Sequence, residues 1–166
     1  MNQALGREFT ESEVDEALKQ MQPMKSPGPD GFSAGFFQSS WAIVRSEVCK
    51  TVLNFLNHDI FDDSLNETHI VLIPKIKSLV SVTDFRPISL CNVLYKIIAK
   101  VLANRMKIVS PYIVSQNQSA FIPGRHITDN IIVAFESFHS VVNRLKGKQG
   151  FMALKLDISK AYDQVE

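Results

Sequence analysis

One carboxylate in the last part of the sequence has surroundings that suit metal chemistry. Asp157 follows an apolar run in which Met152, Leu154 and Leu156 alternate with other residues. This period of two predicts a β-strand with the three apolar side chains on one face and Asp157 on the other, at the C-terminal end. An oxygen ligand on a rigid strand can hold Mg2+ beside phosphate groups. The alternative for this segment alone is an ordinary buried strand followed by a helix with an Asp near its N-terminus.

Two basic residues in the middle of the chain have the chemistry for binding phosphates. Residues 68–75 form a predicted strand that ends at Lys75, and residues 84–90 form a second one that carries Arg86. Because only a polar loop with Lys77 separates them, we expect a hairpin that presents Lys75 and Arg86 together. A guanidinium offers a planar fork for phosphate oxygens, and an ammonium offers a mobile point charge. For either residue alone, a solvated surface charge is the alternative.

Helices are predicted ahead of this hairpin. A capping box at Thr10–Glu13 begins one helix. That helix must end by Gln22, because Pro23 follows and disfavours helical geometry in the residue before it. Residues 34–57 form a second helix, interrupted near Ser39–Ser40, with an apolar stripe that is typical of a core.

Two later helices also carry apolar stripes. The first is predicted over residues 92–106, and four basic residues lie largely on its outer side: Lys96, Lys100, Arg105 and Lys107. This basic side could face solvent or contact a nucleic-acid backbone. For Lys96 and Lys100, solvent is the preferred interpretation. The second, over residues 128–145, is predicted to direct six apolar side chains inward: Ile131, Ile132, Phe135, Phe138, Val142 and Leu145.

The composition is that of an ordinary globular protein. The 166 residues, 45% hydrophobic and 21% charged, suffice for one domain with a core or for a large piece of a bigger domain. Cys49 and Cys91 lack Cys or His neighbours at metal spacing, which argues against a disulfide framework and a zinc site. The first ten residues show no secretory signal, and no apolar run approaches about 18 residues. We expect an intracellular protein, nuclear or cytoplasmic, with no membrane partner.

Charge is distributed unevenly along the chain. Residues 1–67 carry 5 Lys or Arg and 11 Asp or Glu, whereas residues 68–148 carry 11 and 3. A basic middle beside a carboxylate-bearing strand suits a surface that binds a phosphate backbone next to a metal site. Solvated charges on long helices are the alternative explanation.

Several segments resemble motifs of reverse transcriptases, most closely those of LINE-type non-LTR retrotransposons. In chain order they are KSPGPDGF (25–32), LIPK (72–75), FRPISL (85–90), QSAFIPGRHITDNI (118–131) and LDISKAYD (156–163). The resemblance extends from about Phe9 to Glu166. The first segment is diagnostic of the family and is not expected to be catalytic.

The resemblance implies an α+β fold: helix-rich fingers with a β-hairpin, then the first catalytic strand of a right-hand polymerase palm. Residues 1–150 would form an N-terminal extension and the fingers, and residues 151–166 the start of the palm. The implied reaction is RNA-directed DNA synthesis by two-metal nucleotidyl transfer. Its partners would be an RNA template, a DNA primer and deoxynucleoside triphosphates.

Roles for individual residues also follow from the resemblance. Asp157 would be the catalytic ligand of two Mg2+ ions, and the backbone carbonyl of Ile158 would help to hold one of them. Lys75 and Arg86 would bind the triphosphate of the incoming nucleotide. Tyr162 would lie under the sugar and exclude a ribose 2′-hydroxyl.

Nucleic-acid contacts are implied for two further residues, Arg125 and Lys77, with Arg125 on the template strand. The sequence departs from the family pattern in lacking the later [FY]-A-D-D tetrapeptide and in having Gln164 where the family usually has Arg. We therefore expect the N-terminal half of a polymerase domain, without the remaining palm and the thumb, that does not polymerise alone. The alternatives are a non-catalytic nucleic-acid-binding remnant that uses residues 68–148, and a truncated product without function.

Overall fold

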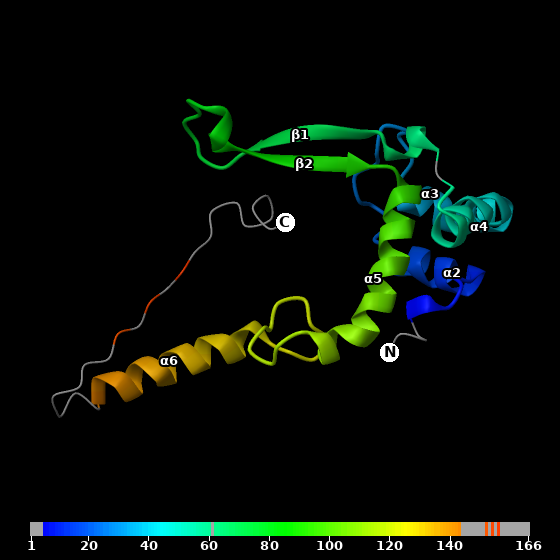
Figure 1. Cartoon of the computed structure of the whole chain (residues 1–166). Coiled ribbons are helices and arrows are strands. Elements are labelled where there is room, and N and C mark those ends of the chain that lie inside the picture. The colour runs from blue at the N-terminus through cyan, green and yellow to red at the C-terminus, as the bar shows by residue number, and fades with distance from the viewer. Residues whose placement is uncertain (1–4, 61, 144–151, 153, 155, 157–166) are drawn as a thin grey trace. The chain divides into compact units, whose positions relative to one another are not determined.

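The computed structural model describes residues 5–60, 62–143, 152, 154 and 156 (Figure 1). Helices and a two-stranded antiparallel sheet occur together, so the predicted α+β class is confirmed. The chain divides into two compact units, Met1–Ser110 and Pro111–Glu166. The predicted boundary at residue 150 lies outside the described residues.

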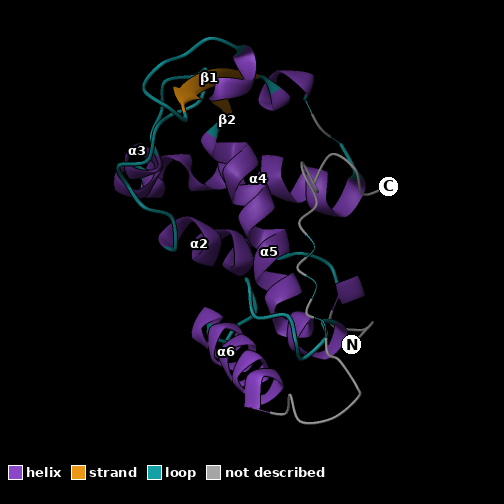
Figure 2. Cartoon of the chain, turned by 90° about the vertical axis from the view of Figure 1, so that its left-hand side faces the viewer, coloured by secondary structure: helices purple, strands orange, loops and turns teal. Residues whose placement is uncertain are grey.

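Helix dominates over strand among the described residues (Figure 2). In chain order the α-helices and strands are α2 (Glu11–Lys19), α3 (Ala34–Ser39), α4 (Trp41–His58), β1 (Thr68–Pro74), β2 (Phe85–Cys91), α5 (Val93–Ile113) and α6 (Ile127–Asn143). Two short 3-10 helices, Asp63–Asn66 and Val82–Asp84, precede β1 and β2. The predicted interruption near Ser39–Ser40 is confirmed, since α3 ends and α4 begins there.

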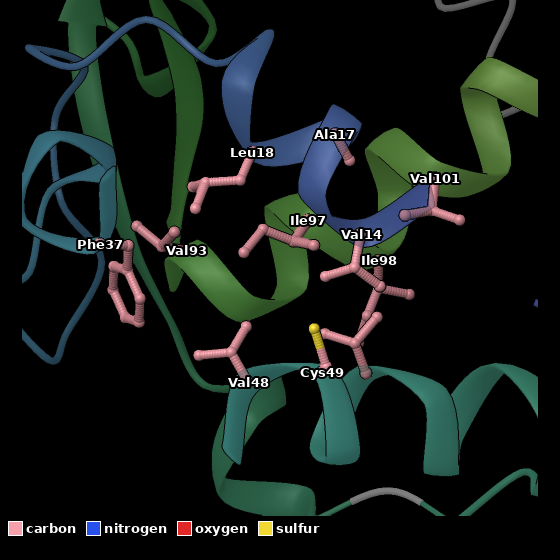
Figure 3. Packing of buried hydrophobic residues seen from close by; sticks show 11 residues of the cluster. Val14, Ala17, Leu18, Phe37, Val48, Cys49, Val93, Ile97, Ile98 and Val101 are labelled. Carbon is pink, nitrogen blue, oxygen red and sulfur yellow. The ribbon is translucent and has the colours of Figure 1, made fainter. Parts of the chain in front are cut away.

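The core of the first unit lies where α2, α4 and α5 meet. The apolar stripes predicted from helical spacing supply its buried side chains, which point toward one another in Figure 3. The cluster contains Val14, Ala17 and Leu18 from α2, Phe37 from α3, Val48, Cys49 and Val52 from α4, and Val93, Ile97, Ile98 and Val101 from α5. This core gives α5 a fixed base, and β2 leads directly into α5.

The predicted hairpin is confirmed. β1 and β2 pair antiparallel in a continuous register from Thr68↔Cys91 to Pro74↔Phe85. Pro87, which has no N–H to donate, lies opposite Leu72 in this register. The two strands continue as a long ribbon away from the start of α5 (Figure 1). The tip of the hairpin is therefore held by strand pairing, and its base by the packed helix.

The proline- and glycine-rich loop after α2 packs closely against the start of α5. A Cβ on Gly28 would lie 2.4 Å from Oδ1 of Asn92 and 2.5 Å from its backbone nitrogen. The same Asn92 oxygen accepts a hydrogen bond from the Asp30 N–H at 3.3 Å. Nζ of Lys96 donates to the Ser26 carbonyl at 2.9 Å. The loop thus braces the junction between the hairpin and α5, which explains the need for glycine at position 28.

Arg105 corrects the predicted basic outer face of α5. Its side chain is only 4% exposed and forms an ion pair with Glu13, with Nε 2.7 Å from Oε1. The guanidinium also donates to the carbonyls of Leu5, Arg7 and Glu8, and it lies over the Phe9 ring. The prediction of an outward Arg105 is wrong because this fork ties the segment before α2 to α5.

The predicted capping box at the start of α2 also involves Glu13. Its carboxylate accepts from the Thr10 N–H at 3.0 Å and from the Thr10 hydroxyl at 3.1 Å. The hydrogen bond from Arg105 is the main cause that lowers the pKa of Glu13 from 4.5 to about 2, and the hydrogen bonds from Thr10 add to it. The ionised carboxylate is therefore a stabilising group in the folded chain.

Stability is expected to fall as this carboxylate becomes protonated. A lowered folded-state pKa stabilises the fold fully above the ordinary pKa of 4.5, and that contribution is lost as the pH falls toward about 2. The free energy of unfolding of the wild type, compared with Glu13→Gln by urea titration, should show a difference that shrinks between pH 5 and about 2. A difference that stays constant over this range would contradict the assigned role of Glu13.

α5 is longer than predicted. α5 continues to Ile113 instead of ending near Met106. Pro111, inside its last turn, leaves the Lys107 carbonyl without its usual N–H partner, and the Ser110 hydroxyl donates to that carbonyl at 3.2 Å. The helix therefore passes the proline with this carbonyl satisfied.

The prediction that α6 faces a core is wrong within the described residues. The helix contains no buried residue, and its apolar side chains, such as Phe135 at 71% exposure, are open to solvent. Leu145 lies outside the described residues. A helix stripe is buried only against another element, and the described part of the second unit supplies α6 and the loop before it.

Candidate nucleotide-binding hairpin

The two predicted phosphate-binding residues lie at the tip of the hairpin. Arg86 in β2 pairs with Ile73 in β1, and Lys75 comes two residues after Ile73. The pairing continues one step beyond the strands, because the Lys75 N–H donates to the Asp84 carbonyl at 2.7 Å. Since side chains alternate along a strand, Lys75 and Arg86 share one face of the ribbon. Both side chains are exposed, so this face presents two cations to solvent.

Asp84 organises the loop that joins the two strands. Its Oδ2 accepts the backbone N–H groups of Val80 and Ser81, each at 2.9 Å. These hydrogen bonds, first that of Val80, lower the pKa of Asp84 below its ordinary value, and the charge of Lys75 adds a smaller effect. A carboxylate that stays ionised keeps the loop in one conformation, and with it the backbone of Lys75.

The ammonium group of Lys75 is held by the same loop. Its Nζ donates to the Thr83 carbonyl at 2.8 Å. Lys77 follows in the loop with an exposed side chain, and together with Pro74, Ile76 and Leu79 these lysines line a shallow hollow at the tip. The structure thus brings Lys75, Lys77 and Arg86 together on one loop-bearing ribbon end. The arrangement can bind an anion with several oxygens through one fork and two point charges.

Arg125 belongs to the second unit and is engaged with its own loop. One terminal nitrogen donates to the carbonyls of Ser115 and Gln118, the latter at 2.7 Å. The other donates to the carbonyls of Pro111 and Val114 at 3.4 and 3.3 Å. The guanidinium therefore satisfies carbonyls at the end of α5 and in the following loop, and its Nε–H is the donor left over.

The three other predicted site residues, Asp157, Ile158 and Tyr162, lie outside the described residues. Within the described residues, no group of three or more His, Cys, Asp or Glu side chains could hold a metal ion. The structure places Lys75, Lys77 and Arg86 on one end of the hairpin, and the roles of all the predicted site residues stay predictions.

Asp84 is the site residue that sequence reasoning missed. Ser81 and Asp84 form a capping box on the 3-10 helix before β2, with the Ser81 N–H as one of the donors to Asp84. The spacing of a serine followed three residues later by an acid was a readable signal for this turn. The predicted strand over residues 84–90 includes Asp84 as its first residue, whereas β2 begins at Phe85.

Among the described residues, none of the helices combines the length and apolar character needed to cross a bilayer.

Comparison with known proteins identifies relatives along most of the sequence. A family model described as reverse transcriptase (RNA-dependent DNA polymerase) matches residues 73–166. The chain is 32% identical over 158 residues to the "Transposon TX1 uncharacterized 149 kDa protein" of Xenopus laevis, covering 95% of this chain and 12% of that protein. It is 26% identical over 155 residues to the "Retrovirus-related Pol polyprotein from type-1 retrotransposable element R2" of Nasonia vitripennis, covering 92% and 14%. The chain thus spans about an eighth of the length of these curated relatives.

Proposed function

Because the chain belongs to the reverse transcriptase (RNA-dependent DNA polymerase) family, we propose that it supplies the nucleotide-binding fingers of an RNA-directed DNA polymerase from a non-LTR retrotransposon. In this proposal residues 1–150 are an N-terminal extension and the fingers, and residues 151–166 begin the palm. The observation that carries it is the hairpin register, which puts Lys75 and Arg86 on one exposed face. Both residues lie inside the segment that the family model matches.

Lys75 and Arg86 bind the triphosphate of the incoming deoxynucleotide. The guanidinium of Arg86 holds two phosphate oxygens in its fork, and the Lys75 ammonium balances a further negative charge. Asp84 keeps the loop ordered, and the Thr83 carbonyl of that loop holds the Lys75 side chain in position before the nucleotide binds. Little conformational entropy is then lost on binding, which favours affinity.

The metal-binding part of the proposal rests on the chemistry of the donor set. The Asp157 carboxylate and the Ile158 carbonyl are hard oxygen donors, which suit Mg2+. When bound, two such ions would stabilise the attacking and leaving oxygens of the transferred phosphate. Tyr162 lies against the sugar and selects deoxyribose by excluding a 2′-hydroxyl.

An RNA template and a DNA primer are the proposed partners. Lys77, exposed beside Lys75, contacts the nucleic-acid backbone. Arg125 contacts the template through the loop that its guanidinium holds, since both of its terminal nitrogens already donate to backbone carbonyls.

Removing either hairpin cation should weaken nucleotide binding. Lys75→Ala and Arg86→Ala each remove a charge-assisted hydrogen bond, worth about 1.5 kcal/mol or more, so each should raise the Kd for a deoxynucleoside triphosphate by about tenfold. Arg86→Lys keeps the charge but loses the planar fork, so its Kd should lie between that of the wild type and that of Arg86→Ala. Fluorescence anisotropy with a labelled deoxyadenosine triphosphate and Mg2+ measures these constants.

The matched control is Lys50→Ala, which removes an exposed lysine from α4, away from the hairpin. Its Kd should equal that of the wild type. If Lys50→Ala weakened binding as much as Lys75→Ala, the effect would come from net charge alone. The hairpin would then lose its assigned role.

A further inference from the structure

A second basic surface lies in the first unit, apart from the hairpin tip. A groove there is lined by Gln20, Met21 and Gln22 at the end of α2, by Lys25 in the following loop, and by Lys96 and Lys100 on α5. The two α5 lysines are four residues apart, a spacing that puts them on one side of the helix. Their intervening neighbours Ile97 and Ile98 are buried in the core. Three ammonium groups therefore border one groove.

The three lysines have no acidic partner within the part of the chain that the structure describes. Its ion pairs use Arg7, Arg45 and Arg105 as the cations. The groove residue Gln20 donates its side-chain amide to the carboxylate of Glu16 at 2.8 Å. Like charges four residues apart on a helix repel one another, which destabilises the free protein slightly. A bound anion would relieve this repulsion.

Carbonyls at the C-terminal end of α2 already have donors within the protein. The carbonyls that end this helix carry the negative pole of its dipole. However, the side-chain amide of Gln38 donates to the carbonyls of Leu18 and Met21, both at 2.9 Å. The Gln20 N–H donates to the Glu16 carbonyl at 3.1 Å. The carbonyls of Glu16, Leu18 and Met21 are thus satisfied without the groove lysines.

Lys96 is also fixed in position. Its Nζ donates to the Ser26 carbonyl at 2.9 Å, which holds the ammonium at the rim beside the loop that carries Lys25. A lysine ammonium has further N–H donors that can bind a second acceptor. Part of the entropy cost of ordering this side chain is therefore already met in the free protein.

We propose that the groove lined by Lys25, Lys96 and Lys100 binds the phosphate backbone of a polynucleotide strand. Point charges on flexible stems match successive phosphates without reading base sequence. The inference rests on the proposed function, because a polymerase of this family works on nucleic acid. It adds a contact surface formed by the loop after α2 and the outer side of α5. Lys96 and Lys100, which the sequence predicts to face solvent, would bind phosphates in this surface.

The test measures strand binding by a variant in which all three lysines are changed to glutamine. Glutamine removes the charge and keeps an N–H donor. Anisotropy titrations of a labelled single-stranded RNA, and of DNA with the same sequence, are run at several salt concentrations. The negative slope of log K against log salt should become less steep by about 2. Affinity at 0.1 M salt should fall by about 10- to 100-fold for RNA and DNA alike.

The matched control changes three exposed lysines outside the groove, Lys19, Lys50 and Lys107, to glutamine. It lowers the net charge equally and should leave most of the slope intact. Lys100→Glu, which breaks no hydrogen bond to the loop, should weaken binding further than Lys100→Gln. Circular dichroism verifies that each variant is folded.

Several outcomes would overturn the proposal. One is an unchanged slope in the groove variant, and another is an equal loss in the control variant. Inorganic triphosphate that displaces the strand at the same phosphate concentration would identify a free polyphosphate as the ligand instead. Nucleotide binding at Lys75 and Arg86 is measured separately in the same variant. A groove variant that binds both RNA and nucleotide like the wild type contradicts this inference alone. Unchanged nucleotide binding in the Lys75→Ala and Arg86→Ala variants would instead contradict the proposed function.

Discussion

Replacing Arg105 with methionine is expected to lower the free energy of unfolding by about 3–5 kcal/mol, the usual cost of removing one partner from a buried ion pair. Methionine fills similar space but cannot donate to the carboxylate of Glu13 or to the carbonyls of Leu5, Arg7 and Glu8. Those acceptors would lose their donors in a site where Arg105 itself is 4% exposed. The contact of the guanidinium with the Phe9 ring would be lost as well.

Urea unfolding followed by circular dichroism measures this change. Arg45→Met is the matched control, because Arg45 also pairs with acids of α2 but is 41% exposed. Exposed pairs contribute little to stability, so the control should unfold close to the wild type. Equal midpoints for Arg105→Met and Arg45→Met would show that burial does not give Arg105 the importance assigned to it.

Replacing Gly28 with alanine is expected to destabilise the fold by about 1–3 kcal/mol through overpacking. The new Cβ would lie 2.4–2.5 Å from atoms of Asn92 and from the backbone carbon of Cys91. Backbone atoms at a strand–helix junction cannot move aside without disturbing β2 or α5. The variant should therefore also weaken nucleotide binding, because the hairpin grows out of this junction.

The control for this substitution is Gly6→Ala, where an added Cβ meets nothing within 4 Å. It should leave both stability and nucleotide affinity unchanged. Thermal unfolding and anisotropy on the same samples separate the two effects. A Gly28→Ala protein as stable as Gly6→Ala would mean that the loop yields easily and does not brace the hairpin.

The hairpin and the core helices could be predicted because their signals are local. Alternating and helical periods identify which side chains face inward, and Val14, Val48 and Ile97 are buried as their spacing requires. Strand length and a short polar loop were enough to pair β1 with β2. The chemistry of Lys75 and Arg86 followed once the strands were paired.

What could not be predicted depends on contacts between distant segments. Arg105 lies four residues after Val101 and so on the buried stripe of α5, but its charge favoured an outward prediction, and its partner Glu13 is 92 positions away. The neighbourhood of Lys25 and Lys96 likewise depends on how the loop after α2 folds back onto α5. The apolar stripe of α6 predicts burial correctly only when another element covers it, and periodicity does not specify that element.

The most direct test of the central claim is photocrosslinking of an azido-deoxyadenosine triphosphate to the chain, followed by peptide mapping. The label should attach within residues 73–88, the hairpin tip that carries Lys75 and Arg86. The double variant Lys75→Ala and Arg86→Ala should lose this label, while Lys50→Ala keeps it. Labelling confined to α2–α4, or labelling that survives the double substitution, would contradict the account of this hairpin as the nucleotide-binding element.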